Sequence, residues 1–316
     1  MEGLSPEKAT ILGMCKTILQ EYTNISCRSI DIVLSVAGTV AENQLIEQLV
    51  AELKSKPSHP EIAYRGHHCW VQTYEPLPVD DIPDTPKLQQ EGVYLITGGL
   101  GGIGLELAEY LATTVKAKLI LVSASALPTV DEWEQWLITH EQEDKVSQKI
   151  RKIKDLEQLG AEILTLSADV ANETQMQAVI TQSLARFGEI HGVIHAAGIK
   201  LFKTIEEISI SECQQQLRAN GHGLFVLEKI LQGIELDFCV LVSSLSSVLG
   251  ALGMAAYPAA HAFTDAFIYK HNQTNSTPWM AVNWDNWLTK QLTIELATKP
   301  EISTEFFMTS QEGIEV

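Results

Sequence analysis

Length, composition and charge place this chain among ordinary globular proteins and exclude several classes of partner. Its 316 residues suffice for one large domain or two unequal ones, and 45% of them are hydrophobic. Acidic residues outnumber basic ones 40 to 22, and such a surface repels nucleic-acid phosphates and anionic membranes. The five cysteines form no Cys-x-x-Cys pair, and no apolar run approaches the roughly 20 residues that span a bilayer. We therefore expect a cytoplasmic protein with free thiols that binds neither nucleic acid nor membrane.

The N-terminal part has the pattern of a small α/β unit. Ser29–Ser35 alternates like a strand, Asn43–Leu53 has helical spacing of apolar residues, and Ile62–Tyr74 reads as two strands joined by a turn. Four prolines lie within residues 75–86, a density that excludes helix and central strand, so a linker is expected there. The two histidines before Cys69 have no second cluster to complete a metal site, and we expect no metal.

From Gly92 onward, short apolar runs alternate with helical segments, which is typical of a parallel sheet covered by helices on both faces. The sequence thus predicts an α/β protein with a Rossmann-type, doubly wound parallel sheet. We expect a truncated N-terminal unit over residues 1–88 and the dinucleotide-binding unit over residues 89–316. The expected strands are Val93–Thr97, Lys118–Val122, Glu162–Ser167, Gly192–His195, Phe238–Val242 and Trp279–Asn283, and the expected helices include Gly102–Thr113, Ser147–Leu159, Glu173–Arg186 and Ile208–Leu231.

A glycine cluster follows the first of these strands and opens a helix. Glycines at such a turn let the backbone approach a pyrophosphate, which the helix N-terminus then stabilises. The strand before the loop and the helix after it indicate dinucleotide binding more strongly than the glycine spacing does alone. The expected cofactor-binding residues of this loop are Thr97, Gly98, Gly99, Leu100, Gly101, Gly102 and Ile103.

Several motifs occur together in one order along the chain. The spacing Thr97-Gly98-x-x-x-Gly102-x-Gly104 is followed by 127–136 (Leu-Pro, then two tryptophans), 243–250 (Ser-Ser-Leu-Ser-Ser-Val-Leu-Gly) and 283–287 (Asn-Trp-Asp-Asn-Trp). Together they resemble the ketoreductase domain of a modular polyketide synthase, a member of the short-chain dehydrogenase/reductase superfamily. Residues 21–66 resemble the end of that family's cofactor-free structural subdomain.

The resemblance implies an activity and a set of partners. The family reaction is the NADPH-dependent reduction of a β-ketoacyl thioester, carried by an acyl carrier protein, to the β-hydroxyacyl product. It implies the acyl carrier protein and neighbouring polyketide synthase domains as partners. Further cofactor-contacting positions are expected after the third strand, at Asp169 and Val170, and after the fourth, at His195, Ala196, Ala197 and Gly198.

Two catalytic residues match the family pattern and two depart from it. Tyr257 matches the tyrosine that protonates the ketone oxygen, and Ser244 matches the serine that holds it. Asn220 stands where the family has lysine, and His261 stands where it has asparagine. Other short-chain dehydrogenases exchange these two roles, but neither arrangement is complete without a lysine. We therefore expect impaired activity, with His261 either a partial substitute for the missing charge or a packed residue.

The segment after the second strand also departs from the family. There an arginine normally grips the 2′-phosphate of NADPH, whereas this chain has Ser123, Ala124 and Ser125. We expect NADPH as the cofactor, bound with reduced affinity. NADH is the alternative, although the acidic residue that would indicate NADH is also absent from this segment.

Three functions stay open on the sequence. The first is an NADPH-dependent ketoreductase of weakened activity. The second is a redox-inactive domain that keeps the reductase fold as a structural or docking element of a megasynthase. The third is a free-standing short-chain dehydrogenase, which the N-terminal unit disfavours.

Overall fold

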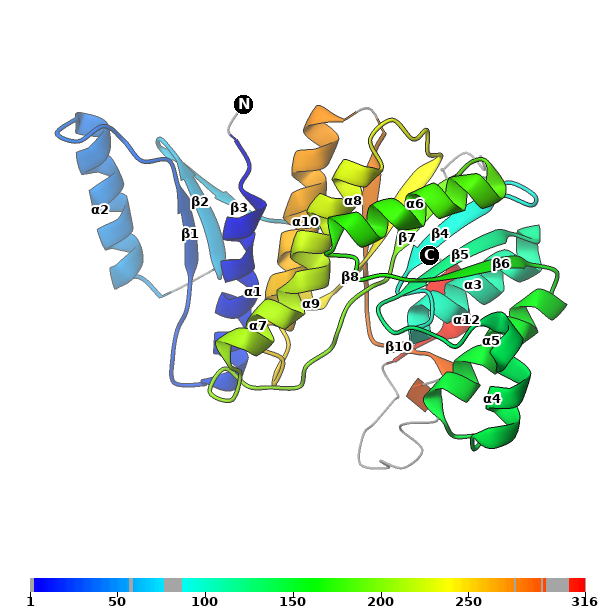
Figure 1. Cartoon of the computed structure of the whole chain (residues 1–316). Helices are drawn as coiled ribbons and strands as arrows, with labels where there is room; N and C mark the ends of the chain where they lie inside the picture. The colour runs from blue at the N-terminus through cyan, green and yellow to red at the C-terminus, as the bar shows by residue number, and fades with distance from the viewer. Residues whose placement is uncertain are drawn as a thin grey trace.

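A six-stranded, all-parallel sheet forms the larger part of the computed structural model, which describes residues 3–56, 59–76, 87–275, 277–290, 292–293 and 307–315 (Figure 1). The strand order β6-β5-β4-β7-β8-β9 is that of a doubly wound fold, with the chain reversing direction across the sheet between β4 and β7. The predicted parallel sheet is confirmed. Its strands are β4 (Val93–Thr97), β5 (Lys118–Ser123), β6 (Glu162–Ser167), β7 (Gly192–His195), β8 (Phe238–Ser244) and β9 (Trp279–Trp284).

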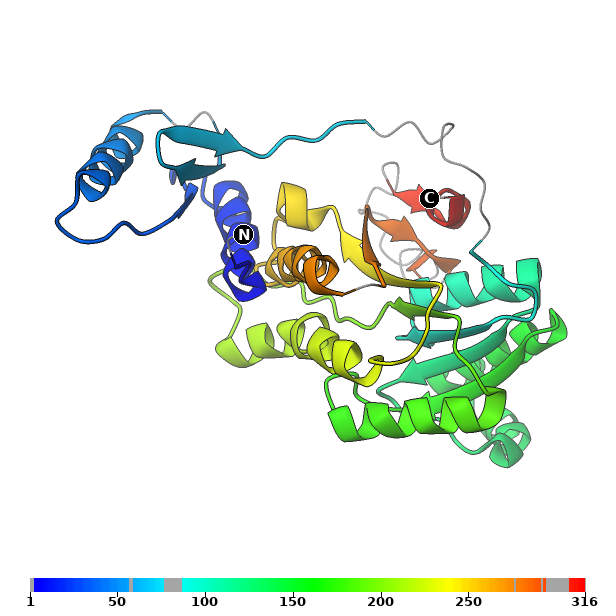
Figure 2. The ribbon, with the colours of Figure 1, turned by 90° about the horizontal axis from the view of Figure 1, so that it is seen from above.

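Helices cover both faces of this sheet (Figure 2). Alternate side chains of β4 point to opposite faces, so Tyr94 and Ile96 pack with α3, α4 and α5, whereas Leu95 packs with α6, α8 and α10. No helix among the described residues has the length and apolar character needed to cross a membrane. The helices of this part are α3 (Gly102–Val115), η2 (Val130–Glu132), α4 (Trp133–Thr139), α5 (Lys145–Gln158), α6 (Glu173–Phe187), α7 (Ile210–Leu217), η3 (Arg218–His222), α8 (Gly223–Ile230), α9 (Ser246–Leu249) and α10 (Tyr257–Thr274).

The prediction of a single helix over Ile208–Leu231 is wrong in one respect. The segment is divided into α7 and α8 by a π-helical turn at Arg218–His222. A π-turn inserts one extra residue without changing the apolar pattern on either side, so periodicity does not reveal it. The turn carries Asn220, which is 3% exposed, and directs it toward the carboxyl edge of the sheet.

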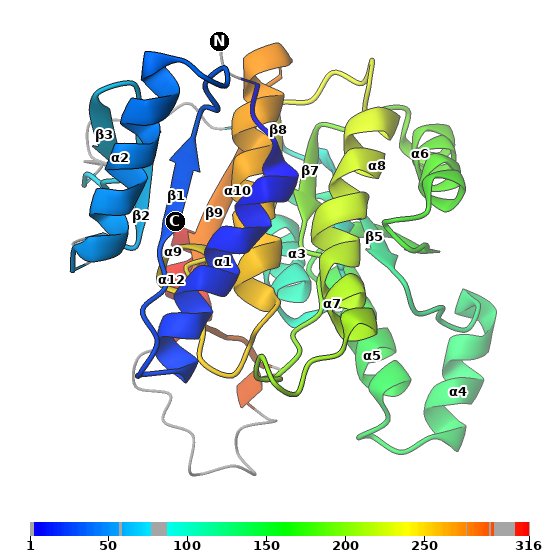
Figure 3. The ribbon, with the colours of Figure 1, turned by 90° about the vertical axis from the view of Figure 1, so that its left-hand side faces the viewer.

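The N-terminal part forms a second, three-stranded sheet in the order β1-β2-β3 (Figure 3). The turn between β2 and β3 contains Gly66 at φ +61°, as the sequence predicted. The domain boundary at residues 88 and 89 stays a prediction, since 77–86 of the expected linker lie outside the described residues. The elements here are α1 (Pro6–Glu21), β1 (Ser29–Ile32), α2 (Val40–Lys54), β2 (Glu61–Arg65) and β3 (His68–Val71), and the C-terminal part adds β10 (Trp287–Leu288), β11 (Met308–Thr309) and α12 (Ser310–Glu315).

Helix α1 packs mainly along α10, and Lys16 also forms an ion pair with Glu61 of β2 at 2.9 Å (Figure 3). The two helices meet at Gly13, where an added Cβ would lie 2.3 Å from backbone atoms of Pro258 and Ala259. Side chains of α1 also bind α9, the short helix that follows β8: Lys16 Nζ donates to the Ser247 carbonyl at 2.6 Å, and Gln20 Nε2 to the Leu249 carbonyl at 2.6 Å. The start of α10 and α9 are therefore held by the N-terminal helix.

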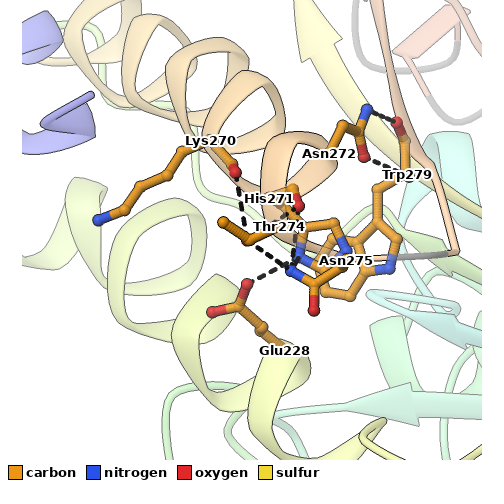
Figure 4. Close-up of polar contacts among 7 residues, drawn as sticks. All are labelled: Glu228, Lys270, His271, Asn272, Thr274, Asn275 and Trp279. Atoms are coloured by element: carbon orange, nitrogen blue, oxygen red, sulfur yellow. Dashed lines mark hydrogen bonds and ion pairs between the residues drawn. The ribbon is translucent and has the colours of Figure 1, made fainter. Parts of the chain in front are cut away.

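The other end of α10 is fixed to the start of β9 (Figure 4). The Asn272 side chain acts as donor to the Trp279 carbonyl and as acceptor from the Trp279 amide, both at 2.9 Å. His271 stacks on the Trp279 ring with centroids 4.3 Å apart, and its Nδ1 lies 2.7 Å from Glu228 Oε1 on α8. Contacts at both ends thus determine where α10 presents its first residue, Tyr257.

Candidate active site

A cavity of about 730 Å³ opens at the carboxyl ends of β4, β7, β8 and β9, next to the point where the strand order reverses. Ligands of doubly wound sheets bind at this edge. The cavity brings together residues that lie far apart in the sequence. The sequence-predicted residues that line it are Gly101, Gly102, Ile103, Ala196, Ala197, Gly198, Asn220, Ser244, Tyr257 and His261.

The glycine loop forms one wall of the cavity. Gly98 has φ +69°, and an added Cβ would lie 2.6 Å from the Ala196 carbonyl oxygen, so only glycine fits there. The loop leads directly into α3, whose first turn presents free backbone N–H groups at Gly102 and Ile103. These features fit the pyrophosphate of a dinucleotide, which needs close backbone approach and a helix N-terminus.

Other predicted cofactor residues lie around the cavity without lining it. Thr97 is buried, and its Oγ1 lies 2.7 Å from His195 Nδ1, which joins β4 to β7. Asp169 accepts from Arg218 Nε at 2.8 Å and from the Ala171 amide at 2.9 Å. Val170 is buried, whereas Gly99 and Leu100 continue the turn beside β5.

The segment Ser123–Ser125 ends β5 at the same edge of the sheet. Ala124 and Ser125 are exposed, and the Ser125 amide donates to Ser123 Oγ at 3.3 Å. The place where the resemblance implies a phosphate-gripping arginine therefore offers hydroxyl groups and an open surface, but no charge.

Ser244 and Tyr257 converge in the cavity. Ser244 is the last residue of β8 and Tyr257 the first of α10; both line the cavity, and the Ser244 hydroxyl is placed to donate to the Tyr257 oxygen when the phenol ionises. Burial raises the pKa of Tyr257 above its ordinary value, and the bond from Ser244 lowers it in part. Two neighbouring O–H groups, a phenol and an aliphatic hydroxyl, can both donate hydrogen bonds to a ketone oxygen as it gains negative charge.

His261 lies one helical turn after Tyr257, with the two rings in an edge-to-face arrangement and centroids 4.4 Å apart. The imidazole is 5% exposed, and burial, with the nearby charge of Lys200, lowers its pKa to about 3. It is therefore neutral at physiological pH and does not replace the missing cation. Asn220 is also buried, and its Nδ2 lies 3.4 Å from Thr264 Oγ1.

A carboxylate two turns after Tyr257 ties α10 to its surroundings. Asp265 accepts from Ser243 Oγ and Ser247 Oγ, each at 2.7 Å, and from Asn283 Nδ2 at 2.8 Å. Ser243 Oγ also lies 3.4 Å from His261 Nδ1. Because these donors come from β8, α9 and β9, Asp265 fixes the helix that carries Tyr257 to the strand that carries Ser244.

Several polar residues of the cavity were not predicted from the sequence, among them Lys200, Asp285 and Asn286. Lys200 follows β7, and Asp285 and Asn286 follow β9. Lys200 Nζ lies 5.4 Å from the centroid of the Tyr257 ring and donates to Asn286 Oδ1 at 2.9 Å. Their positions just after parallel strands were the available signal, because the carboxyl ends of such strands meet at one edge.

Comparison with known proteins identifies the family. The KR domain model matches residues 92–289, which include the glycine loop, Ser244 and Tyr257. The chain belongs to the KR domain family. It is a ketoreductase domain of the polyketide synthase type, with the short-chain dehydrogenase/reductase fold.

Relatives with this domain are much longer proteins. Over 270 residues the chain is 32% identical to polyketide synthase PksM of Bacillus subtilis, covering 84% of this chain and 6% of the relative. Over 225 residues it is 32% identical to 6-methylsalicylic acid synthase of Aspergillus terreus, covering 69% of this chain and 12% of the relative. The chain thus spans a small fraction of each.

Solved ketoreductase structures share the fold over nearly the whole chain. A ketoreductase domain from the bacillaene assembly line superposes with a TM-score of 0.75 at 23% identity, covering 98% of this chain and 70% of that one. The first-module ketoreductase PlmKR1 of phoslactomycin biosynthesis from Streptomyces sp. HK803 gives a TM-score of 0.77 at 22% identity. The match covers 100% of this chain and 67% of PlmKR1. Both parts of the chain therefore belong to one known architecture.

Proposed function

We propose that this KR domain reduces a β-ketoacyl thioester, carried by an acyl carrier protein, to the β-hydroxyacyl product with NADPH. The observation that carries the proposal is that Ser244 and Tyr257 meet inside the cavity that the glycine loop borders. The polyketide synthase relatives, of which the chain matches a small part, support a place within a multidomain assembly line.

NADPH, when bound, supplies the hydride that adds to the ketone carbon. Tyr257 gives its phenolic proton to the ketone oxygen, and Ser244 donates a hydrogen bond to that oxygen while the proton moves. Asp265 maintains the spacing of these two hydroxyls through its bonds to Ser243 and Ser247. Solvent entering the open cavity then returns a proton to Tyr257.

A single-turnover assay tests this function. The domain is mixed with NADPH and a β-ketoacyl thioester of a simple thiol, and the β-hydroxy product is measured by mass spectrometry. We expect product to form more slowly than it would with a lysine at position 220, because Asn220 and His261 themselves supply no charge. NADPH binding without any product would favour the second function, a redox-inactive domain that retains the fold and joins neighbouring domains.

The cofactor preference gives a separate prediction. Ala124 is exposed at the carboxyl end of β5, so an arginine there has room to reach a 2′-phosphate. Ala124→Arg is expected to tighten NADPH binding by about tenfold, the value of one charge-assisted pair, and to leave NADH binding unchanged. Fluorescence titration with both cofactors measures this. Equal tightening of both, or strong wild-type discrimination in favour of NADPH, would show that another group binds the phosphate.

A further inference from the structure

Lys200 is held in a defined position over the aromatic face of Tyr257. Its ammonium lies 5.4 Å from the ring centroid, within the range of a cation–π contact. Asn286, which follows β9, accepts a hydrogen bond from the same ammonium at 2.9 Å. A second ring, that of Phe202, lies 5.8 Å from Nζ. Lys200 is exposed to solvent, and these three contacts set the position of its ammonium.

Among the described residues that line the cavity, Lys200 is the only lysine or arginine. The nearby titratable groups are Tyr257 and His261 on α10 and Asp285 in the loop after β9. His261 is neutral, and partial loss of hydration lowers the pKa of Lys200, an effect that the charge of Asp285 opposes. An ammonium is the ordinary form of lysine at neutral pH, and no other described cavity residue is a lysine or arginine that could supply a positive charge to Tyr257.

A cation in this position acts on Tyr257 when the phenol loses its proton. The negative charge of a tyrosinate spreads over the ring, and the ammonium lies over that ring. An opposite charge within about 4–6 Å lowers the pKa of an acid by about 1–3 units, and exposure to solvent reduces this toward the lower limit. A shift of one pKa unit corresponds to an increase in the rate of proton transfer on the order of tenfold.

We propose that Lys200 is the cation of this active site, a positioning residue that acts through Tyr257 by stabilising the tyrosinate formed during reduction. In that step the O–H bond of Tyr257 breaks, its proton forms a bond to the ketone oxygen, and Lys200 keeps all its protons. The catalytic part of this inference rests on the proposed function, whereas the effect on the phenol does not.

Titration of the phenol tests the electrostatic effect without any turnover. Lys200→Arg keeps a positive charge at all accessible pH values, and Lys200→Met removes it. Each variant is compared with its own Tyr257→Phe double mutant, so that the difference in tyrosinate absorbance isolates Tyr257 from the other tyrosines. We expect the Tyr257 midpoint to lie about one pH unit lower in the arginine variant than in the methionine variant. Coincident midpoints would overturn the proposal.

Kinetics test the role in reduction. Lys200→Met is expected to lower kcat about tenfold at neutral pH with little change in KM, and Lys200→Arg to restore it. Wild-type kcat should fall at alkaline pH through two ionisations, those of Lys200 and Tyr257, and the arginine variant should show only the ionisation of Tyr257. A rise in KM at constant kcat would mean instead that Lys200 only holds an anionic part of the substrate.

Lys203 provides the matched control. Its ammonium lies 3.7 Å from Glu212 on the surface, outside the cavity, so Lys203→Met should leave both the titration and kcat unchanged. If neither the wild type nor any variant reduces a ketone, the proposed function fails, and the tyrosinate titration still decides whether Lys200 acts on Tyr257.

Discussion

Tyr257→Phe is expected to lower kcat for ketone reduction by a factor of about 10²–10⁴, the usual contribution of a positioned general acid. The substitution removes only the hydroxyl that meets Ser244, and it leaves the ring in contact with His261 and Lys200. NADPH affinity should therefore change little. Steady-state rates and a fluorescence titration of NADPH on the same preparations measure the two effects.

Tyr269 lies on the same helix and is 69% exposed, so Tyr269→Phe is the control for a lost phenolic hydroxyl outside the site. It should retain wild-type kcat. If Tyr257→Phe reduces a ketone as fast as the wild type, another group donates the proton, and the assignment of Tyr257 is wrong.

Acid is expected to destabilise the domain steeply because two buried histidines remain neutral in the folded state. Burial lowers the pKa of His195 to about 4 and, with the charge of Lys200, lowers that of His261 to about 3. In the unfolded chain the pKa values of both histidines return to about 6.5. Below that pH the unfolded state binds more protons than the folded state, so the free energy of unfolding falls as the pH falls. The loss should reach about 3 kcal/mol between pH 6.5 and pH 5 from the two residues together.

Chemical denaturation at a series of pH values measures this loss, and His261→Asn should remove about half of the pH dependence over that interval. His140 is exposed on the surface, and His140→Asn should leave the pH dependence unchanged. An unfolding free energy that stays constant between pH 6.5 and pH 5 would show that these imidazoles are charged when folded. In that case His261, rather than Lys200, would supply the cation beside Tyr257.

The sheet was predictable because its signals are local. Each central strand is a short apolar run, since both faces of a parallel sheet are covered, and β4 is buried over its entire length. The glycine loop follows β4 directly, and this order predicted the edge of the sheet at which the cavity lies. Ser244 and Tyr257 were found through motifs, and the fold brings them together because a strand ends at one and a helix begins at the other.

The rest of the site depends on contacts between distant segments. Lys200 stands in a stretch without periodicity, and only the fold places it over Tyr257 and beside Asn286. Asp265 is similar, because its donors are Ser243, Ser247 and Asn283, which no local pattern connects to it. The hypothesis that His261 carries a partial charge depended on burial, which a single sequence does not specify at one position.

The packing of α1 on α10 has a consequence for the order of folding. Lys16 on α1 and its acceptor Ser247 are separated by 231 positions, so α1 leaves the ribosome long before the surface that covers it has been synthesised. Contacts of such separation close late and slow the folding of a domain, because a long loop must be ordered first. Until α10 is made, the face around Gly13 stays open to other chains. Helix α1 is thus translated well before α10 and is among the last elements of the domain to dock.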